Sequence, residues 1–337
     1  MIEPEHLASC LEQAIARRAS LLQRLHAAGT DCYRLFHGIA EGAPGVTLDR
    51  YGPLLLLQTF RAALAAQVVE RLRAVACRAL GLELAIACNH RGGTPLPGFV
   101  EHEPTADALA EHECREEGAR FLVRARHRGQ DPWLFLDLRA GRRLVRSLAA
   151  GRSVLNLFAY TCSIGVAAAI AGARSVLNVD FSHTALDVGE RNARQNGIAR
   201  ERFTTLRSDC IPVLRQLAGL PVQRPGRHVP FPRVDVQRFD LVVLDPPRFA
   251  KGPFGTVDVV NDYQSLWKPC VLALAEAGAL IATNHVPEAT EASWHEDLRR
   301  CAAKAGRPLQ SLEPIEVDAD FPSFDGKTPL KVVLARV

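Results

Sequence analysis

The sequence predicts an α/β protein with a doubly wound, mainly parallel sheet and a smaller α+β domain before it. From residue 131 onward, short apolar segments of strand character alternate with helical segments, which is typical of a doubly wound sheet. Over residues 31–130, strand segments are instead separated mainly by turn signals. The length of 337 residues fits two domains, and 47% hydrophobic with 23% charged residues excludes a disordered chain.

The first 130 residues divide into a helical segment and a small α+β domain. Leucines recur at helical spacing over residues 4–28. Gly-Ala-Pro-Gly at 42–45 and Tyr-Gly-Pro at 51–53 predict turns between strands. We expect a helix at 62–80 and strands at 33–37, 46–49, 54–60, 84–88 and 119–126. The expected boundaries are a helical segment at 1–30 and an α+β domain, a candidate for RNA or substrate binding, at 31–130.

The second domain is expected to span residues 131–337. Its strands are expected at 153–158, 175–180, 202–206, 241–245, 279–283 and 331–335, with helices at 164–171 and 184–196 among others. The stretch 221–238 carries four prolines and four arginines, which predicts an irregular surface insertion.

Composition sets the broad class of protein. The net charge of +4 neither requires nor excludes a nucleic-acid partner. No apolar run approaches the length of a membrane span, and the N-terminus lacks a hydrophobic signal core, so we expect a cytoplasmic protein without a membrane partner. Nine scattered cysteines without a Cys-x-x-Cys pair indicate reduced thiols rather than disulfides or a zinc site.

The ends of the expected parallel strands carry the chemistry, because ligands of open α/β sheets bind beyond these ends. The loop after the first strand has a single glycine, Gly165, where a pyrophosphate site needs Gly-x-Gly-x-x-Gly. Asp180 follows the second strand, where it can accept from both ribose hydroxyls, and Asp209 follows the third, where it can accept an adenine amino group. Asp-Pro-Pro-Arg-Phe at 245–249 follows the fourth. This order indicates a site for S-adenosylmethionine (SAM).

Each of these features also has a purely structural explanation. Asp180 can be a solvated strand end, Asp209 a helix N-cap and Pro246-Pro247 a plain turn. In the functional interpretation, the two prolines stiffen the backbone and aim Asp245 and nearby carbonyls at a planar substrate. Phe249 then offers a stacking face. The combined order of the features favours the functional interpretation.

Four motifs are similar to those of one enzyme family: Gly-Ala-Pro-Gly-Val-Thr-Leu-Asp-Arg-Tyr-Gly at 42–52, Leu-Phe-Leu-Asp-Leu-Arg at 134–139, Asn-Leu-Phe-Ala-Tyr-Thr at 156–161 and Asp-Pro-Pro-Arg-Phe at 245–249. Through them, residues 33–337 resemble class I SAM-dependent methyltransferases, and among these the bacterial large-subunit rRNA methyltransferases. That group includes cytosine-5 and guanine-7 enzymes. The first two motifs lie outside the generic cofactor fold, which makes the resemblance specific.

The resemblance implies a Rossmann-like methyltransferase sheet, SAM as the cofactor, no metal, and RNA as the partner. It implies cofactor contacts at Asp137, Arg139, Asn156, Phe158, Ala159, Thr161, Asp180, Phe181, Asp209, Cys210 and Asp245. Leu138 stands where the family has Gln, and Cys162 where Gly is usual. Only a helical segment precedes residue 31, where some members carry an RNA-binding PUA domain. RNA capture is then expected of the 31–130 domain, or the substrate is smaller.

The methylated atom can be narrowed by asking which nucleophile is present. Carbon 5 of a pyrimidine needs a thiolate, which family members supply in Ser-Cys-Ser after the fifth strand. Here the matching stretch is Ala-Thr-Asn-His at 282–285. Cys162 and Cys210 are expected to be buried inert thiols and Cys270 to pack a helix, so cytosine-5 chemistry is disfavoured.

A base nitrogen is the favoured target. A ring nitrogen has its own lone pair and needs only an in-line approach to the methyl group. An exocyclic amine would want acceptors, which Asp245 and the Pro246 carbonyl can supply. Guanine-7 members resemble this chain in having Asn after the fifth strand, as Asn284 does. The predicted catalytic set, which holds a flipped-out base, is Asp245, Pro246, Pro247, Phe249 and Asn284.

Two other clusters contain residue types that can bind metal ions or phosphates. Glu101-His-Glu and Glu111-His-Glu-Cys114 contain ligand-type residues, but their spacing matches no helix-borne zinc pattern, and an acidic loop is expected. A basic run of alternate side chains has two equal interpretations, a phosphate-binding face or a solvated edge strand. It consists of Arg120, Arg124, Arg126 and Arg128, with His127.

Two rival functions remain open from the sequence. One is a methyltransferase of a small molecule or a protein side chain. The other is a non-catalytic RNA-binding or ribosome-assembly factor that keeps the cofactor pocket, although the intact Asp-Pro-Pro-Arg-Phe argues against it. The sequence makes no prediction for the oligomeric state.

Overall fold

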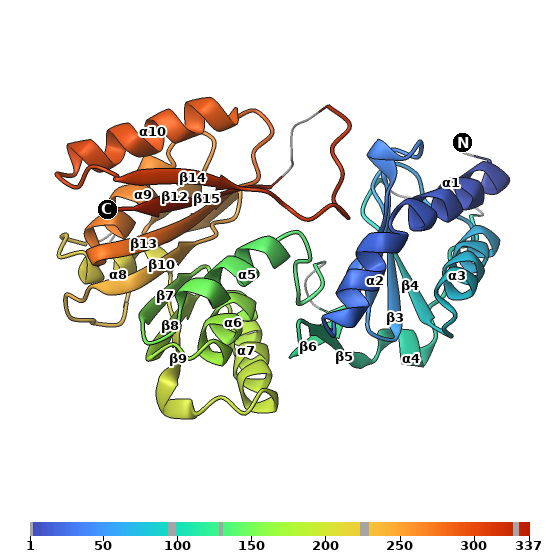
Figure 1. Cartoon of the computed structure of the whole chain (residues 1–337), viewed down its shortest axis with the longest axis horizontal. Helices are drawn as coiled ribbons and strands as arrows, with labels where there is room; N and C mark the ends of the chain where they lie inside the picture. The colour runs from blue at the N-terminus through green and yellow to red at the C-terminus, as the bar shows by residue number, and fades with distance from the viewer. Residues whose placement is uncertain (1–2, 94–98, 128–130, 223–228, 326–329) are drawn as a thin grey trace. The chain divides into compact units, whose positions relative to one another are not determined.

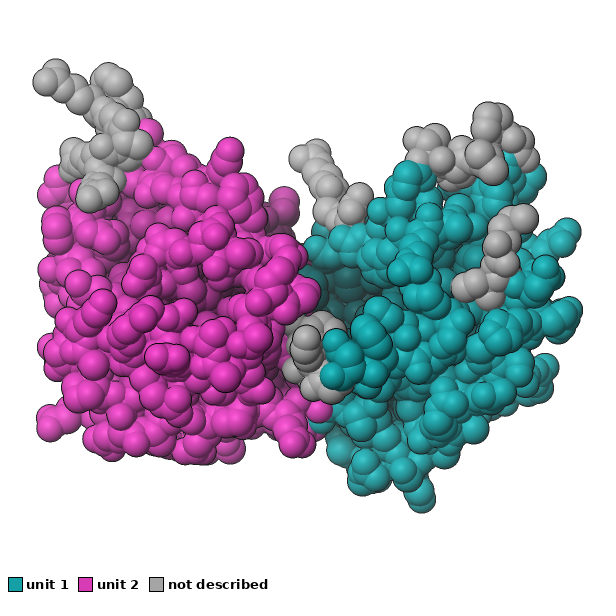
Figure 2. Space-filling view, turned by 90° about the horizontal axis from the view of Figure 1, so that it is seen from above, with its two compact units in different colours: residues 1–136, 318–327 teal, residues 137–317, 328–337 magenta. Residues whose placement is uncertain are grey.

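A computed structural model describes residues 3–93, 99–127, 131–222, 229–325 and 330–337. The chain forms two compact units, drawn in teal and magenta in Figure 2. Unit 1 comprises Met1–Leu136 and Asp318–Lys327, and unit 2 comprises Asp137–Val317 and Thr328–Val337. The sequence-based division at 30/31 and 130/131 differs from this one, because the N-terminal helices and a late segment both belong to unit 1.

Unit 1 is built on a four-stranded sheet of order β1-β2-β3-β4, in which only the β3/β4 pair is parallel. Its strands are Cys32–His37 (β1), Val46–Tyr51 (β2), Leu54–Thr59 (β3) and Ala85–His90 (β4). Three helices share its core: Pro4–Arg17 (α1), Ala19–Ala27 (α2) and Ala66–Leu80 (α3). The predicted strands and the helix before β4 are confirmed.

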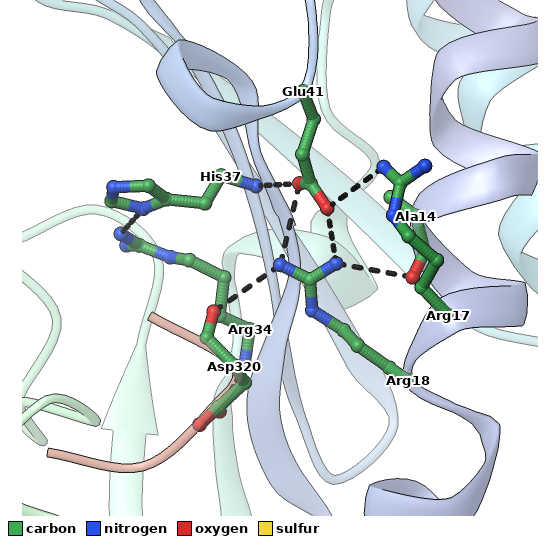
Figure 3. A network of polar contacts seen from close by, with 7 residues as sticks. All are labelled: Ala14, Arg17, Arg18, Arg34, His37, Glu41 and Asp320. Atoms are coloured by element: carbon green, nitrogen blue, oxygen red, sulfur yellow. Dashed lines mark hydrogen bonds and ion pairs between the residues drawn. The ribbon is translucent and has the colours of Figure 1, made fainter. Parts of the chain in front are cut away.

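The helix expected over residues 4–28 is wrong in one respect, because it is two helices that separate at Arg18. The Arg18 guanidinium turns inward and is only 5% exposed. It donates to the Ala14 carbonyl at 3.0 Å and forms an ion pair with Glu41 (Figure 3). A buried charge needs such partners, and the position of Glu41 could not be known from helical periodicity.

A late segment of the chain is held in unit 1 by the same cluster (Figure 3). Asp320 is fully buried, its carboxylate accepts the Arg34 amide at 3.0 Å, and its carbonyl accepts from Arg18 at 3.3 Å. The Arg34 guanidinium lies 4.5 Å from the centre of the Phe321 ring. These contacts explain why residues 318–325, the described part of this late segment, belong to unit 1.

A two-stranded sheet completes unit 1, formed by Glu111–Glu116 (β5) and Ala119–Arg124 (β6), after the short helix Ala106–Leu109 (α4). The acidic loop expected at residues 111–114 is therefore wrong. Cys114 is fully buried, while Glu113 forms an ion pair with Arg120 of β6 at 2.6 Å. Pairing with oppositely charged neighbours lets an acidic stretch form a strand.

Unit 2 contains a seven-stranded sheet of order β14-β15-β13-β10-β7-β8-β9 (Figure 1). Its strands are Ser153–Leu157 (β7), Ser175–Asp180 (β8), Phe203–Arg207 (β9), Phe239–Leu244 (β10), Leu274–Asn284 (β13), Ser311–Ile315 (β14) and Lys331–Arg336 (β15). The strands β9, β8, β7, β10 and β13 are parallel to one another. Strand β15 pairs antiparallel with β13 on one side and with β14 on the other. The doubly wound, mainly parallel sheet is confirmed, with its reversal of strand order between β7 and β10.

Helices cover both faces of this sheet (Figure 1). Cys210–Leu217 (α8), Gln264–Leu272 (α9) and Glu291–Lys304 (α10) share one apolar core with the sheet. Ser163–Ile170 (α6) and His183–Gln195 (α7) pack against the β7–β9 side, and Arg139–Leu148 (α5) packs on α6. Val179 faces the first core while its neighbour Asn178 faces α6, as the period of two in a strand requires.

Two further segments bear on the site. A hairpin of Phe249–Gly252 (β11) and Gly255–Asp258 (β12) follows β10 directly and was not predicted. The described residues of the 221–238 insertion, 221–222 and 229–238, have no regular secondary structure, as predicted, and 223–228 lie outside the described residues. Within the described part of the chain, no helix is both long and apolar enough to span a membrane.

Candidate cofactor and acceptor site

The loop after β7 has an unusual backbone. Phe158, Tyr160 and Cys162 adopt positive φ values of 56°, 48° and 58°. Non-glycine residues pay roughly 1–2 kcal/mol each for this conformation, so surrounding contacts must hold it. The Ala159 amide donates to the Val179 carbonyl at 3.0 Å, and the Tyr160 amide donates to Asp180 at 2.8 Å. The loop is thereby fixed to the tip of β8 at the start of α6.

Asp180, the last residue of β8, holds the loop after β7 in place. One carboxylate oxygen accepts the Tyr160 amide and the other accepts the Ser182 amide, both at 2.8 Å. The residue is 5% exposed, and burial raises its pKa above the ordinary value. The alternative of a solvated strand end is therefore wrong. The Phe181 amide is a third donor to this carboxylate. A carboxylate has about four acceptor sites, so one remains for a ligand hydroxyl, and contact with both ribose hydroxyls stays a prediction. Phe181 beside it is 68% exposed.

Asp209 caps a helix. It accepts the Ile211 amide at 2.9 Å, as an N-cap of α8 should, so the N-cap interpretation is confirmed. The Phe254 amide, in the turn of the β11–β12 hairpin, also donates to it. A Cβ at Gly252 would lie 2.4 Å from its Oδ2, so the hairpin turn packs directly on this carboxylate. Burial raises the pKa of Asp209, and its contact with an adenine stays a prediction.

Gly165, the single glycine between β7 and the end of α6, lets α6 pack closely against β8. A Cβ there would lie 2.0 Å from Oδ1 of Asn178. That oxygen accepts from Nδ2 of Asn156 at 2.9 Å, and Asn156 is 2% exposed. The glycine therefore lets α6 approach a buried pair of asparagines, which agrees with the absence of a pyrophosphate motif. The predicted cofactor contact of Asn156 stays a prediction.

The cysteines near the loop are buried, as predicted. The Cys210 thiol accepts from the Phe158 amide at 3.3 Å and donates to the Val179 carbonyl at 3.4 Å. Cys162 is fully buried, and a Cβ at Gly189 would lie 2.4 Å from its sulfur. Burial raises the pKa of Cys162, Cys210 and Cys270. None of the three is an activated thiolate.

The remaining predicted cofactor residues surround the same loop. Ala159 and Thr161 lie within it and are buried, and Asn192 of α7 donates to the Thr161 carbonyl at 3.2 Å. Asp137 and Arg139 lie at the start of α5, and the Arg139 side chain is fully buried. Their contacts with a cofactor stay predictions.

The tips of β10 and β13 form a second cluster. The Thr283 hydroxyl donates to Asp245, and His285 Nε2 lies 2.9 Å from the Pro246 carbonyl oxygen. The structure therefore brings Asp245 and Pro246 to the end of β13, where Asn284 lies. Pro247 continues the chain toward the hairpin. Phe249, the first residue of β11, is 55% exposed.

No signal in the sequence pointed to Thr283, His285 or Asn178 as partners of the predicted residues, because strand register was unknown. Metal ligation is a separate matter. Across the described residues, no three His, Cys, Asp or Glu side chains are grouped to hold a metal ion.

The sheet order, the buried aspartate at the tip of β8 and the Asp-Pro-Pro tip of β10 together define a Rossmann-like SAM-binding enzyme. The family model for S-adenosylmethionine-dependent methyltransferases matches residues 98–336, and the chain belongs to this family. SAM is its cofactor.

Curated relatives agree with the family. "Ribosomal RNA large subunit methyltransferase I" of Escherichia coli O1:K1 is 29% identical over 321 residues, covering 93% of this chain and 74% of the relative. The protein of the same name from Cronobacter sakazakii is 30% identical over 301 residues, covering 87% of this chain and 71% of the relative.

Solved structures share the fold. SMU.776, a methyltransferase in complex with SAH, aligns with a TM-score of 0.80 at 22% identity, covering 100% of this chain and 82% of that chain. A SAM-dependent methyltransferase from Agrobacterium tumefaciens aligns with a TM-score of 0.60 at 19% identity, covering 91% of this chain and 90% of that chain.

Proposed function

We propose that the chain methylates a nitrogen of a base in large-subunit ribosomal RNA. The relatives are named for methylation of large-subunit rRNA, which supports the substrate class. The observation that carries the choice of atom is Asn284 at the tip of β13, where cytosine-5 enzymes resembling this chain have a cysteine. The cysteines at the loops nearby are buried thiols of raised pKa, which supports a mechanism without a covalent nucleophile.

In this proposal the cofactor supplies an electrophilic methyl group on a sulfonium. The carboxylate of Asp180 accepts from the ribose hydroxyls, and the fixed β7 loop orients the bound nucleoside. Asp245 and the Pro246 carbonyl face the acceptor base, and Phe249 stacks on it. A nitrogen lone pair then needs an in-line approach and no thiolate, so positioning supplies most of the catalysis.

The basic run of unit 1 contributes little to the proposal. Arg120 is paired with Glu113, and Arg126 donates to Asn89 at 2.8 Å and to the Cys88 carbonyl at 2.6 Å. These bonds favour the solvated-edge interpretation, and Arg128 lies outside the described residues. RNA as the partner therefore rests on the names of the relatives, and a cytoplasmic site of action stays a prediction from the sequence.

Nucleoside mass spectrometry tests the proposal. Ribosomal RNA from a strain lacking the gene is compared with wild-type rRNA and with rRNA from the strain complemented by the intact gene. We expect the loss of one nitrogen-methylated base and its return on complementation. Loss of 5-methylcytidine alone would contradict the proposal.

The rival functions give different results. A small-molecule or protein methyltransferase leaves rRNA methylation unchanged and does not retain rRNA fragments in a filter-binding assay. A non-catalytic assembly factor binds SAM in calorimetry and retains rRNA, but transfers no methyl group to it.

A further inference from the structure

A pocket of about 390 Å³ opens in unit 2 beside the tip of β13. Its walls come from the segment after β12, from α9 and from α10, and Asn284, Tyr263 and Trp294 line it. This volume falls within the range of small-molecule sites, roughly 300–1,000 Å³. Thr283, whose hydroxyl donates to Asp245, directly precedes Asn284, so the pocket begins one residue along β13 from a contact with the Asp-Pro-Pro tip.

Two residues that line the pocket each have a buried nitrogen without a hydrogen-bond partner among the described residues. These nitrogens are Nδ2 of Asn284, a residue 1% exposed, and Nε1 of Trp294, a residue 3% exposed. By contrast, the indole of Trp267 in the same wall donates to the Leu298 carbonyl at 3.0 Å. An unsatisfied buried donor costs roughly 1–3 kcal/mol, so two of them beside one pocket call for an acceptor from outside the chain.

The free end of the Asn284 amide is its nitrogen. The Val286 amide donates to Oδ1 of Asn284 at 2.8 Å, which identifies the oxygen. Lys331 donates to the Val286 carbonyl at 2.7 Å and holds this segment in place. The amide is therefore fixed with its donor end unpaired.

An aromatic pair supports the second donor. The Trp294 ring meets the Tyr263 ring edge-to-face, with centroids 5.5 Å apart and planes at 80°. The Tyr263 hydroxyl donates to the Thr283 carbonyl at 2.8 Å, which ties this pair to the end of β13. The pocket thus combines aromatic surface with two donors, the combination that suits a planar ring carrying hydrogen-bond acceptors.

We propose that this pocket receives the acceptor base and selects a carbonyl-bearing edge through Asn284 and Trp294. The inference rests on the proposed function and specifies its substrate. A carbonyl oxygen has two lone pairs and accepts from both nitrogens, whereas an exocyclic amino group at that position would face two donors with donors of its own. A site built to hydrogen-bond a substrate group discriminates strongly against an analogue that lacks it. Because both nitrogens are buried, the base reaches them with a movement of the pocket wall.

The test uses inosine and adenosine 5′-monophosphates, which share the ribose phosphate and the purine frame. Inosine has a carbonyl at position 6 and a proton on N1, whereas adenosine has an amino group at position 6 and no proton on N1. The full chain, labelled with ¹⁵N and saturated with SAH, has three tryptophans and so three indole N–H signals. The Trp294→Phe and Trp133→Phe variants assign two of them, and Trp133, which lies in unit 1 and does not line the pocket, is the internal reference. We expect inosine monophosphate to shift the Trp294 signal saturably and adenosine monophosphate to bind at least about tenfold more weakly, or about 1.4 kcal/mol. No shift with inosine monophosphate, or equal shifts with both, overturns the proposal.

Variants separate recognition from folding. Asn284→Asp replaces the donor by an acceptor of equal size and should abolish detectable inosine monophosphate binding. Gln310→Glu makes the same chemical change at an exposed position outside the pocket and should leave binding within about twofold. If Asn284→Asp fails to bind SAH, Trp294→Phe carries the test by calorimetry and should weaken inosine monophosphate binding. Unchanged binding in that variant overturns the inference.

These results are distinguishable from failure of the proposed function. If the inference alone fails, rRNA from the deletion strain still lacks a nitrogen-methylated base while the indole signal does not discriminate the two nucleotides. If the proposed function fails, that rRNA is unchanged, whatever the pocket binds.

Discussion

The tips of β7 and β8 differ from those of β10 and β13 in how they treat their polar groups. At β8, both oxygens of Asp180 accept backbone amides, and the buried Asn156 donates to Asn178. At β13, Asn284 and the nearby Trp294 each have a buried donor that finds no partner in the described part of the chain. The cofactor half is thus preorganised by contacts within the chain, while the acceptor half retains donors for a second molecule. A preorganised half binds with little reordering, and an unsatisfied one gains selectivity at a cost in stability.

The largest expected effect comes from removing the centre of the preorganised half. Asp180→Ala leaves the Tyr160 and Ser182 amides without their acceptor and removes the predicted ribose contact. We expect SAM affinity to fall at least about 100-fold in calorimetry and the free energy of unfolding to fall by about 2–4 kcal/mol.

The matched control for this variant is Asp187→Asn, an exposed position on α7 whose carboxylate pairs with His183. It should change neither quantity appreciably, because exposed ion pairs contribute little. Full SAM binding by Asp180→Ala would contradict the view that this carboxylate preorganises the cofactor half, since the β7 loop would then not depend on it.

The next effect concerns packing beneath the same loop. Gly165→Ala forces a methyl group against Asn178, where the Cβ would lie 2.0 Å from Oδ1. We expect a loss of about 1–3 kcal/mol in the free energy of unfolding, measured by urea titration. Gly93→Ala, whose Cβ would meet nothing within 4 Å, is the control and should be nearly neutral. A neutral Gly165→Ala would show that α6 can move away from β8 freely.

In unit 1, we expect an intermediate, pH-dependent effect on the free energy of unfolding. It arises from His37, which belongs to the polar cluster around Arg34 and Glu41. Burial, assisted by the Arg34 guanidinium, lowers the pKa of His37 from 6.5 to about 4. The folded state keeps this histidine neutral, while the unfolded chain protonates it near pH 6.5. Stability is therefore lost as the pH falls from about 6.5 toward 4. After a discount for partial exposure, we expect a loss of about 1–2 kcal/mol at pH 5 relative to pH 7.5.

Urea unfolding at the two pH values measures this loss. The His37→Gln variant should lack most of it, while His183→Gln, at an exposed position of α7, should retain it. Equal pH dependence in both variants would contradict the assignment to His37.

The smallest effect is expected at Cys162. Its φ of 58° favours glycine, but its buried sulfur fills the space over Gly189. Relief of backbone strain and loss of apolar burial nearly cancel, so Cys162→Gly should change stability by less than about 1 kcal/mol and leave SAM affinity unchanged. A large loss of SAM affinity in calorimetry would show that the thiol itself shapes the cofactor site.

Much of the fold was predictable because its signals are local. The parallel strands read as apolar runs, and their positions and the acidic residues at their tips follow from the sequence. The helix break at Arg18, the return of residues 318–325 to unit 1 and the strand at 111–116 depend on partners distant in the chain. Periodicity does not identify such partners. Glu41 and Asp320 contact Arg18, and Arg120 contacts Glu113, only in the folded state.

The candidate site divides in the same way. Its strand-tip residues were visible as motifs, and Asp209 proved to be the N-cap that was the alternative. The pairing of Asn156 with Asn178, and of Asp245 with Thr283, required the register of neighbouring strands. The unpaired donor of Trp294 carries no sequence signal at all, since burial without a partner is a property of packing.

A crystal structure of the protein with SAH would show where both halves of the site lie relative to the ligand. We expect the ribose hydroxyls within hydrogen-bond distance of Asp180, and the sulfur facing Asp245 and the pocket beside Asn284. A ligand bound elsewhere, or one whose sulfur faces away from the tips of β10 and β13, would contradict this expectation.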